Sequence, residues 1–274
     1  MEVFEIAFGE HVLKGEVFGG GPHLILCLHG FGNNRRMWGF LKKRLPEGVR
    51  MAALDMPFFG ESEWSGEQKP PGAAELKTLV EQLQATFPDT THLHLLGFSL
   101  GAKFALGIFQ HSPSPIHSCL LISPDGLRIH PLYRFCIYNP IGRPLFKWTI
   151  RRPGFLLFGL RILYNLKIAD AFKYRFVKKQ FESRENRDLL RNVWIGYSNI
   201  RPDLKRVAER TVEWGTHWHV IWGEKDGILP TRLGRDFEKQ VPGSVFHLVE
   251  GGHRLLHPPK QEVLTLIDTI LKEL

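Results

Sequence analysis

Short apolar runs alternate along the chain with segments in which apolar residues recur at helical spacing. Val3–Phe8 and Val12–Phe18 alternate loosely between apolar and polar residues around Gly9-Glu10, a pattern typical of a β-hairpin. Leu24–Leu28 is a short and continuously apolar run, as in a strand that is buried on both faces of a sheet. Further short strands are predicted over Met51–Leu54, Leu93–Leu96, Cys119–Ile122, Trp218–Trp222 and Val245–Val249.

Helical spacing is clearest over Ala73–Phe87, where Leu76, Leu79, Val80 and Leu83 fall on one face and Pro88 ends the pattern. Further helices are predicted over Arg36–Leu45, Leu100–Phe109, Arg232–Gln240 and Lys260–Leu274. Strands that alternate with helices predict an α/β fold, with a mostly parallel sheet and helices on both of its faces.

Positive charge is concentrated in one part of the chain. The formal net charge is +8, yet residues 126–213 hold 19 Lys and Arg against 7 Asp and Glu, so the remainder is mildly acidic. All five tyrosines also lie in this segment, where apolar and basic residues interleave. We therefore predict a core made of residues 1–125 and 214–274, and a basic, aromatic-rich helical insert at 126–213 that follows the sixth strand.

Cysteine content and the start of the chain bear on its compartment. Cys27, Cys119 and Cys136 form no C-x-x-C pair, and an odd number of cysteines suits a reducing compartment. The first ten residues carry no basic segment of the kind that opens a secretory signal. The apolar stretch Pro153–Leu160 is far shorter than the roughly 20 residues that span a bilayer. We expect a cytoplasmic protein, with peripheral membrane contact as an open alternative.

The strongest chemical signal is a G-x-S-x-G motif, Gly97-Phe98-Ser99-Leu100-Gly101, placed where a buried strand is predicted to give way to a helix. In that context the serine lies on a sharp turn with its hydroxyl above the sheet, and the two glycines let strand and helix pass closely. Ser99 is therefore a candidate nucleophile, the alternative being a purely structural turn.

A second signal, His29-Gly30-Phe31-Gly32, also follows a buried strand. Negative charge that develops on a carbonyl oxygen needs preorganised N–H donors. The amides of Phe31 and Leu100 are candidates for this oxyanion role, although a glycine-rich turn would give the same pattern. We further expect His29, Gly30 and Phe98 to contact the substrate.

Two more polar positions follow predicted strands, namely Asp226 and His253. The chain has 13 histidines, and His253 stands out because Ser99, Asp226 and His253 each follow the C-terminal end of a strand, the edge at which open α/β sheets carry out chemistry. Alternatives stay open at this point. They are Glu224 or Asp125 for the acid and His257 for the imidazole.

Together these segments resemble the α/β-hydrolase-fold serine hydrolases over essentially the whole core. The resemblance rests on His29–Gly32, Asp55–Ser62, Gly97–Gly101, Gly223–Asp226 and Gly252-His253. It implies that Ser99 is the nucleophile, His253 the base and Asp226 the acid that orients it, and that the insert is a cap, or lid. One departure is visible. The family often has Gly-His-Gly where this chain has Phe58-Phe59-Gly60.

The activity that the resemblance implies is cleavage of a carboxylic ester, or a related acyl bond, of a hydrophobic substrate through an acyl-enzyme, with no cofactor. A thioesterase, an acyltransferase or a C–C bond hydrolase would use the same residues, and a non-catalytic, receptor-like binder of this fold is a further alternative. A metal hydrolase is disfavoured because paired metal-ligand spacing is absent, and Cys27 lies inside a predicted buried strand.

The insert permits two interpretations. In the first, its aromatic residues face a cleft while arginines face water, with their stems covering apolar surface. In the second, the stretch Trp148–Arg152 and the concentrated positive charge bind an anionic membrane or an anionic substrate. Nucleic acid is not an expected partner, because no nucleic-acid-binding motif accompanies the charge. The sequence does not indicate an oligomeric state.

Overall fold

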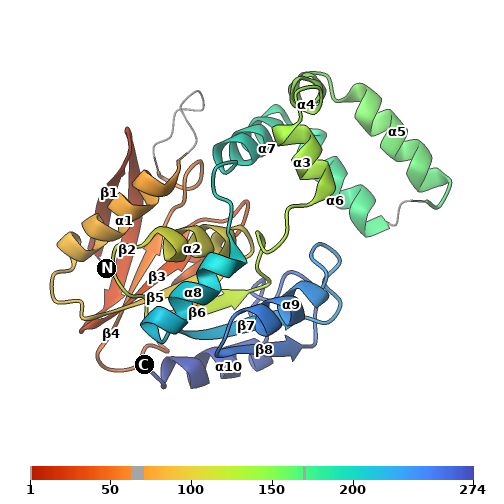
Figure 1. Ribbon diagram of the computed structural model, residues 1–274. Coiled ribbons are helices and arrows are strands. Elements are labelled where there is room, and N and C mark those ends of the chain that lie inside the picture. The colour runs from red at the N-terminus through yellow and green to blue at the C-terminus, as the bar shows by residue number, and fades with distance from the viewer. Residues whose placement is uncertain (1, 63–70, 169–170) are drawn as a thin grey trace. The chain divides into compact units, whose positions relative to one another are not determined.

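Parallel pairing dominates the sheet of the computed structural model, which describes residues 2–62, 71–168 and 171–274 (Figure 1). Met1, 63–70 and 169–170, which fall within the predicted core and insert, lie outside the described residues. The sheet has eight strands in the order β1-β2-β4-β3-β5-β6-β7-β8. The strands are β1 (Glu2–Phe8), β2 (His11–Gly19), β3 (His23–Leu28), β4 (Val49–Leu54), β5 (His92–Phe98), β6 (Ser118–Ile122), β7 (His217–Gly223) and β8 (Ser244–Val249). Among these named strands, β2 pairs in antiparallel fashion with both β1 and β4, and every other pair is parallel.

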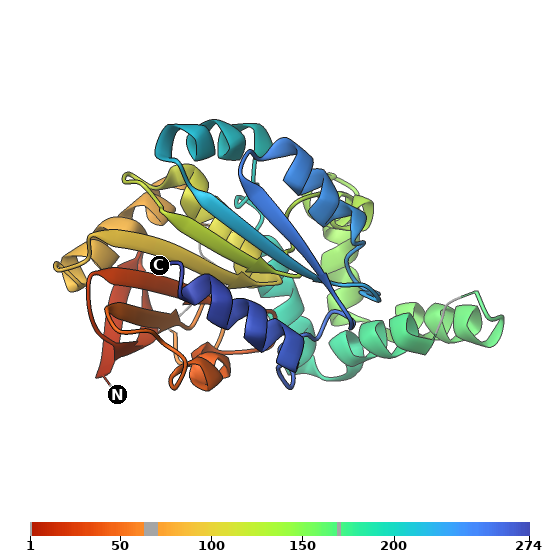
Figure 2. The same ribbon diagram turned by 90° about the horizontal axis from the view of Figure 1, so that it is seen from below.

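Helices cover both faces of this sheet (Figure 2). One face carries α1 (Ala73–Thr86), α2 (Leu100–His111), α8 (Leu204–Trp214) and α9 (Arg232–Gln240). The other face carries the 3₁₀ helix η1 (Arg35–Leu41) and α10 (Gln261–Leu271), and their apolar residues join strand residues in one buried cluster. The predicted α/β-hydrolase fold is thereby confirmed in its sheet and its layers.

Helix α2 is buried along almost its whole length. Every residue from Leu100 to Gln110 is buried, because α2 packs on β3 and β5 and is covered by α1 and α8. Its first residue follows Ser99 directly, so the candidate nucleophile is carried by an element with no solvent face. Such an element resists local opening, since its contacts break only when the core does.

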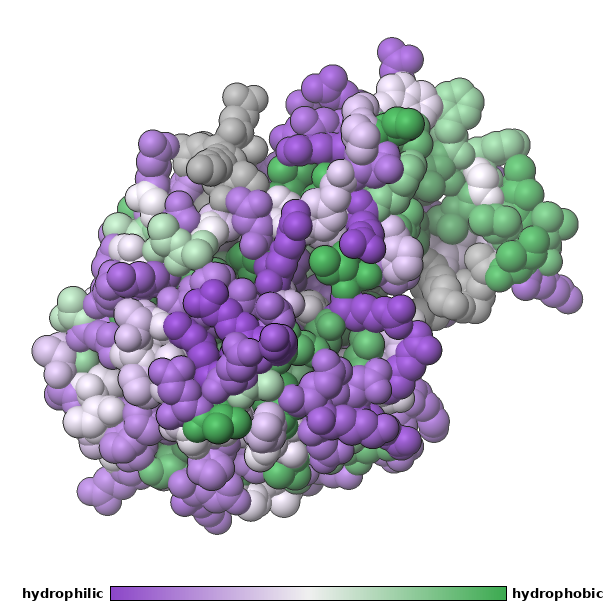
Figure 3. All heavy atoms as spheres, in the orientation of Figure 1, coloured by the Kyte–Doolittle hydropathy of each residue, from purple (hydrophilic) through white to green (hydrophobic). Residues whose placement is uncertain are grey.

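A second compact unit, Ile129–Asn199, consists of helices. They are α3 (Pro131–Tyr138), α4 (Gly142–Arg151), α5 (Gly154–Asn165), α6 (Ala171–Glu182) and α7 (Arg184–Gly196). Its small core includes Phe146, which stacks on Trp194 with ring centroids 5.1 Å apart. Many of its apolar side chains remain on the surface (Figure 3). Within the described residues, no helix has the length and apolar character needed to cross a membrane.

The structure differs from the sequence predictions at two elements. The helix expected over Arg36–Leu45 is a shorter 3₁₀ helix, Arg35–Leu41. The predicted insert, 126–213, is longer than the compact unit, because α8 packs on the core. Arg210 of α8 donates hydrogen bonds to the carbonyls of Phe109 (3.1 Å) and Ser112 (2.7 Å). The basic residues of α8 therefore belong to the core unit.

Histidines gather at the N-terminal edge of the sheet, opposite the edge that carries Ser99. His94 Nε2 lies 3.2 Å from His23 Nδ1, and its Nδ1 lies 2.7 Å from Ser118 Oγ. The ring of His92 stacks on that of His23, and His117 packs beside both His92 and His94. Burial, reinforced by the neighbouring imidazoles, lowers the pKa of His94 from 6.5 to about 3.

This shift predicts a pH-dependent stability. Above pH 6.5 His94 is neutral in both the folded and the unfolded chain and contributes no pH dependence. As the pH falls from 6.5 toward 3, the unfolded chain binds a proton that the folded chain excludes, so the free energy of unfolding falls by up to about 1.4 kcal/mol per pH unit. Urea unfolding at a series of pH values measures this slope.

His94→Gln removes that titration and should flatten the slope between pH 6 and pH 4 by about one proton. His217→Gln, a change of an exposed histidine on the same sheet, is the matched control and should keep the wild-type slope. An unchanged slope in His94→Gln would show that His94 is not held neutral in the folded protein.

Candidate functional site

The backbone of Ser99 adopts a conformation that residues other than glycine rarely take. Its φ is +52°, between the end of β5 and the start of α2. The turn is held by two backbone hydrogen bonds, in which Ser99 N–H donates to Ile122 O (2.9 Å) and Asp125 N–H donates to Ser99 O (3.1 Å). Strain of this kind costs on the order of 1–3 kcal/mol and persists only where the surroundings enforce it.

Two glycines make the turn possible. A Cβ at Gly101 would overlap the carbonyl oxygen of Leu28 at the end of β3, and a Cβ at Gly97 would lie 2.6 Å from Ala102 Cα. Helix α2 can therefore approach β3 and β5 this closely only because both positions lack a side chain. The G-x-S-x-G spacing is a requirement of packing as well as of chemistry.

Ser99, His253 and Asp226 lie in series, each after the C-terminal end of a strand. His253 Nε2 is 2.9 Å from Ser99 Oγ, and His253 Nδ1 is 2.8 Å from Asp226 Oδ2. The Asp226 side chain is fully buried, and its Oδ1 accepts hydrogen bonds from the N–H groups of Ile228 (2.8 Å) and Leu229 (2.9 Å).

This arrangement fixes the imidazole tautomer. An ionised carboxylate only accepts hydrogen bonds, so the proton of His253 lies on Nδ1, facing Asp226. The bare Nε2 then faces the hydroxyl of Ser99 and can accept its proton. The two amides on Oδ1 keep Asp226 oriented, because they occupy the oxygen that the histidine does not use.

The alternatives left open by the sequence have other surroundings. Asp125 Oδ1 accepts from Gly126 N–H (2.7 Å), and its charge faces the buried amine of Lys103, whose pKa is lowered by burial against the opposing effect of Asp125. Glu224 is exposed. His257 Nε2 lies 2.8 Å from Asn33 Oδ1. The structure thus groups Asp226 and His253 with Ser99.

His29 supports the loop after β3. Its ring is fully buried, its Nδ1–H donates to Gly30 O (2.8 Å), and its Nε2 accepts from Met56 N–H (3.0 Å). Burial lowers the pKa of His29 to about 4, so the ring is neutral at pH 7. Since both ring nitrogens bind main chain, His29 fixes the loop that carries Phe31. The predicted contact of His29 with substrate stays a prediction.

Phe98 packs between the His253 ring and the backbone of Gly30. The Phe98 side chain is 4% exposed, and its ring centroid lies 5.7 Å from that of His253 and 5.8 Å from that of His257. A Cβ at Gly30 would come within 2.7 Å of the Phe98 ring. The Phe98 side chain therefore supports the ring of His253, and its predicted contact with substrate stays a prediction.

The two candidate oxyanion amides emerge from adjacent strands, because β3 and β5 pair in parallel with Leu28 opposite Gly97. Leu100 is the first residue of α2, where a backbone N–H has no acceptor within the helix. Phe31 follows the end of β3, with its ring edge-to-face on Phe59 at 5.7 Å between centroids. Both amides thus lie at the sheet edge that carries Ser99.

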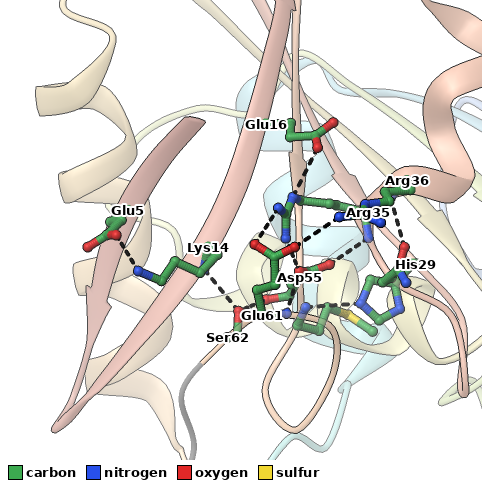
Figure 4. Close-up of polar contacts among 11 residues, drawn as sticks. Glu5, Lys14, Glu16, His29, Arg35, Arg36, Asp55, Glu61 and Ser62 are labelled. Carbon is green, nitrogen blue, oxygen red and sulfur yellow. Dashed lines mark hydrogen bonds and ion pairs between the residues drawn. The ribbon is translucent and has the colours of Figure 1, made fainter. Parts of the chain in front are cut away.

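A buried ion-pair network holds the neighbouring loop after β4 (Figure 4). The Arg35 guanidinium, 4% exposed, binds Asp55, and it binds Glu61 at 2.9 Å. Asp55 Oδ2 also accepts from Glu61 N–H (2.8 Å), while Glu16 Oε1 lies 3.4 Å from Arg35 Nε. Sequence reasoning missed Arg35, since nothing in its local pattern distinguishes it from a surface residue.

The turn that departs from the family pattern, Phe58-Phe59-Gly60, lies beside the same network. Phe58 has a φ of +73°, the conformation for which glycine is favoured, and the chain adopts it with a phenylalanine. Gly60, with a φ of +59°, cannot carry a side chain, because a Cβ there would overlap the Asp55 carboxylate. Phe58 thus takes a glycine-favoured backbone conformation at the position where the family often has glycine.

The described side chains include no group of three His, Cys, Asp or Glu residues that could hold a metal ion.

Comparison with known proteins identifies the family and agrees with the fold. The model of the alpha/beta hydrolase family matches residues 25–266. Pimeloyl-(acyl-carrier protein) methyl ester esterase of Aeromonas hydrophila is 35% identical over 108 residues, which span only 39% of this chain and 40% of that esterase. Monoacylglycerol lipase ABHD6 of Bos taurus is 29% identical over 268 residues, 89% of this chain and 74% of that lipase.

A solved structure of a thermophilic esterase from Thermogutta terrifontis has the same fold. It superposes with a TM-score of 0.67 at 16% identity and covers 99% of each chain. At this identity the likeness concerns the fold alone.

The close approach of α2 and β3 predicts a specific sensitivity. Gly101→Ala places a methyl group onto Leu28 O and should lower the free energy of unfolding by about 2–3 kcal/mol, because packed backbone must separate. Gly39→Ala is the matched control, since no atom lies within 4 Å of a Cβ at that position. Urea unfolding compares the two, and equal stabilities would contradict the packing described.

Proposed function

The chain belongs to the alpha/beta hydrolase family, and on that premise we propose that it is a serine hydrolase that cleaves a carboxylic ester of a hydrophobic acyl substrate. The observation that carries the proposal is the series of contacts from Ser99 Oγ through His253 to Asp226, at 2.9 and 2.8 Å. The names of the relatives point the same way, because one is a methyl ester esterase and another a monoacylglycerol lipase.

The proposed reaction begins with transfer of the Ser99 hydroxyl proton to His253 Nε2 as Ser99 Oγ attacks the acyl carbonyl. The carbonyl oxygen becomes an oxyanion, which the N–H groups of Phe31 and Leu100 stabilise, each by about 3 kcal/mol. Asp226 holds the imidazole in the required tautomer and stabilises the imidazolium. His253 then gives its proton to the leaving alkoxide, and the C–O bond breaks to leave an acyl-enzyme.

Hydrolysis of the acyl-enzyme repeats these steps with water. His253 takes a proton from the water as its oxygen attacks the acyl carbon, and returns the proton to Ser99 Oγ as the acid leaves. In this proposal the unit Ile129–Asn199 serves as the cap. The apolar and aromatic composition of this unit is the reason for proposing a hydrophobic acyl or aryl substrate.

The nucleophile can be tested directly. Ser99→Ala should lower kcat for a short p-nitrophenyl ester by a factor on the order of 10⁴ or more, because nucleophile and base act as a unit. A fluorophosphonate probe should label the wild type covalently and leave the Ser99→Ala protein unlabelled. A wild-type protein that folds normally but neither labels nor hydrolyses any ester or thioester would instead favour a ligand-binding role.

The identity of the acid is tested by a pair of substitutions. Asp226→Asn keeps the shape of the side chain but removes the carboxylate that fixes the His253 tautomer, and should lower kcat by a factor on the order of 10⁴. Asp125→Asn is the matched control and should change kcat by only a few-fold, because its carboxylate binds Gly126 N–H. The reverse ranking in steady-state kinetics would assign the acid role to Asp125.

A further inference from the structure

The unit Ile129–Asn199 carries an apolar surface that its own helices do not cover. Helix α5 has no buried residue along its fully described length. Phe155 is 74% exposed and Phe158 is 67% exposed, and Leu166 at its end is 63% exposed. Figure 3 shows apolar side chains gathered over this helix. Contiguous exposed apolar area of this kind marks an interaction surface on a folded protein.

Positive charge accompanies these apolar residues along the sequence. From Gly142 to Ile168 the sequence contains no Asp or Glu, but it contains Arg143, Lys147, Arg151, Arg152, Arg161 and Lys167. Trp148 of α4 stacks on Phe155 of α5 with ring centroids 5.8 Å apart, which joins the two helices into one aromatic face. A face that combines exposed aromatics with surrounding cations matches the chemistry of a membrane interface.

A second feature of the same unit selects anions. A hollow between α4 and α7 is lined by four arginines, and its other lining residues are Ile150 and Asp188. The arginines are Arg151, Arg184, Arg187 and Arg191. Asp188 is the single carboxylate in this lining and lies 3.6 Å from Arg184 Nε, so positive charge remains in excess. Guanidinium groups bind phosphate oxygens in bidentate fashion, and a bound phosphate would relieve their mutual repulsion.

We propose that the unit Ile129–Asn199 docks on a phospholipid bilayer that contains anionic lipids. The apolar side chains of α5 enter the interface beside Trp148, and the arginines of the α4–α7 hollow bind headgroup phosphates. A second copy of the chain fits less well, because two such faces would place cations against cations. The proposal goes beyond the hydrolytic function, since it concerns binding that requires no turnover.

The test is sedimentation of the Ser99→Ala protein with vesicles, a background that prevents consumption of the lipid. Vesicles of phosphatidylcholine alone are compared with vesicles that contain about 30% phosphatidylglycerol, at low and high salt. We expect binding to the anionic vesicles at least tenfold stronger than to the neutral ones, and a clear loss at about 1 M salt, where charges are screened within about 3 Å.

Two double variants separate the contributions. Phe155→Ser/Phe158→Ser should weaken binding at least roughly tenfold by removing apolar burial. Arg184→Gln/Arg187→Gln should weaken it by roughly tenfold to thirtyfold on anionic vesicles only, at about 1 kcal/mol per charge. The matched controls are Val212→Ser on α8, a residue 69% exposed, and Lys239→Gln/Lys272→Gln on the core. Circular dichroism verifies that each variant is folded.

Sedimentation with neither type of vesicle, or equally with both, would overturn the proposal. A concentration-dependent dimer that Phe155→Ser/Phe158→Ser abolishes, without vesicle binding, would assign the face to a second copy. Fluorophosphonate labelling of the wild type measures the hydrolase separately, so either proposal can fail while the other holds.

Discussion

The left-handed backbone of Ser99 is the constraint on which the rest of the site depends. A φ of +52° at a serine is unfavourable in isolation, so the surroundings must enforce it. They do so by close contact: α2 reaches the end of β3 only because Gly101 has no side chain, and the turn of β5 closes only because Gly97 has none. Once these three elements are packed, Ser99 lies between the end of β5 and the start of α2. The loop after β8 then brings His253 Nε2 to 2.9 Å from its hydroxyl.

Two histidines near this turn show how surroundings decide the role of a side chain. His29 and His253 are chemically identical, and both follow the ends of parallel strands. His29 is fully buried and forms hydrogen bonds to backbone groups with both ring nitrogens, so it stabilises the loop after β3. His253 meets a carboxylate on one nitrogen and a hydroxyl on the other, which leaves a basic nitrogen for proton transfer. Proton chemistry follows from the partners and not from the residue type.

The sequence predicted the strands and their C-terminal edge well, because runs such as Leu93–Leu96 are buried on both faces and carry a strong local signal. It also predicted the grouping of Ser99, Asp226 and His253, since each follows such a run. Tertiary packing decided what was missed. The Arg36–Leu45 spacing did not show that the segment would end at Leu41 as a 3₁₀ helix. The many basic residues of α8 gave no indication that this helix packs on α2. The burial of Arg35 depends on ion pairs with Asp55, Glu16 and Glu61, which lie in distant segments of the sequence.

Among the described residues, the unit Ile129–Asn199 leaves the core after Arg128 and rejoins it at Ile200, between β6 and α8. The packing that holds Ser99, by contrast, is distributed over β3, β5 and α2. Selection can therefore rewrite the unit by substitution, deletion or exchange without disturbing the turn at Ser99. A lineage that acquires a new substrate should diverge first in these helices, while the glycines beside the serine stay fixed.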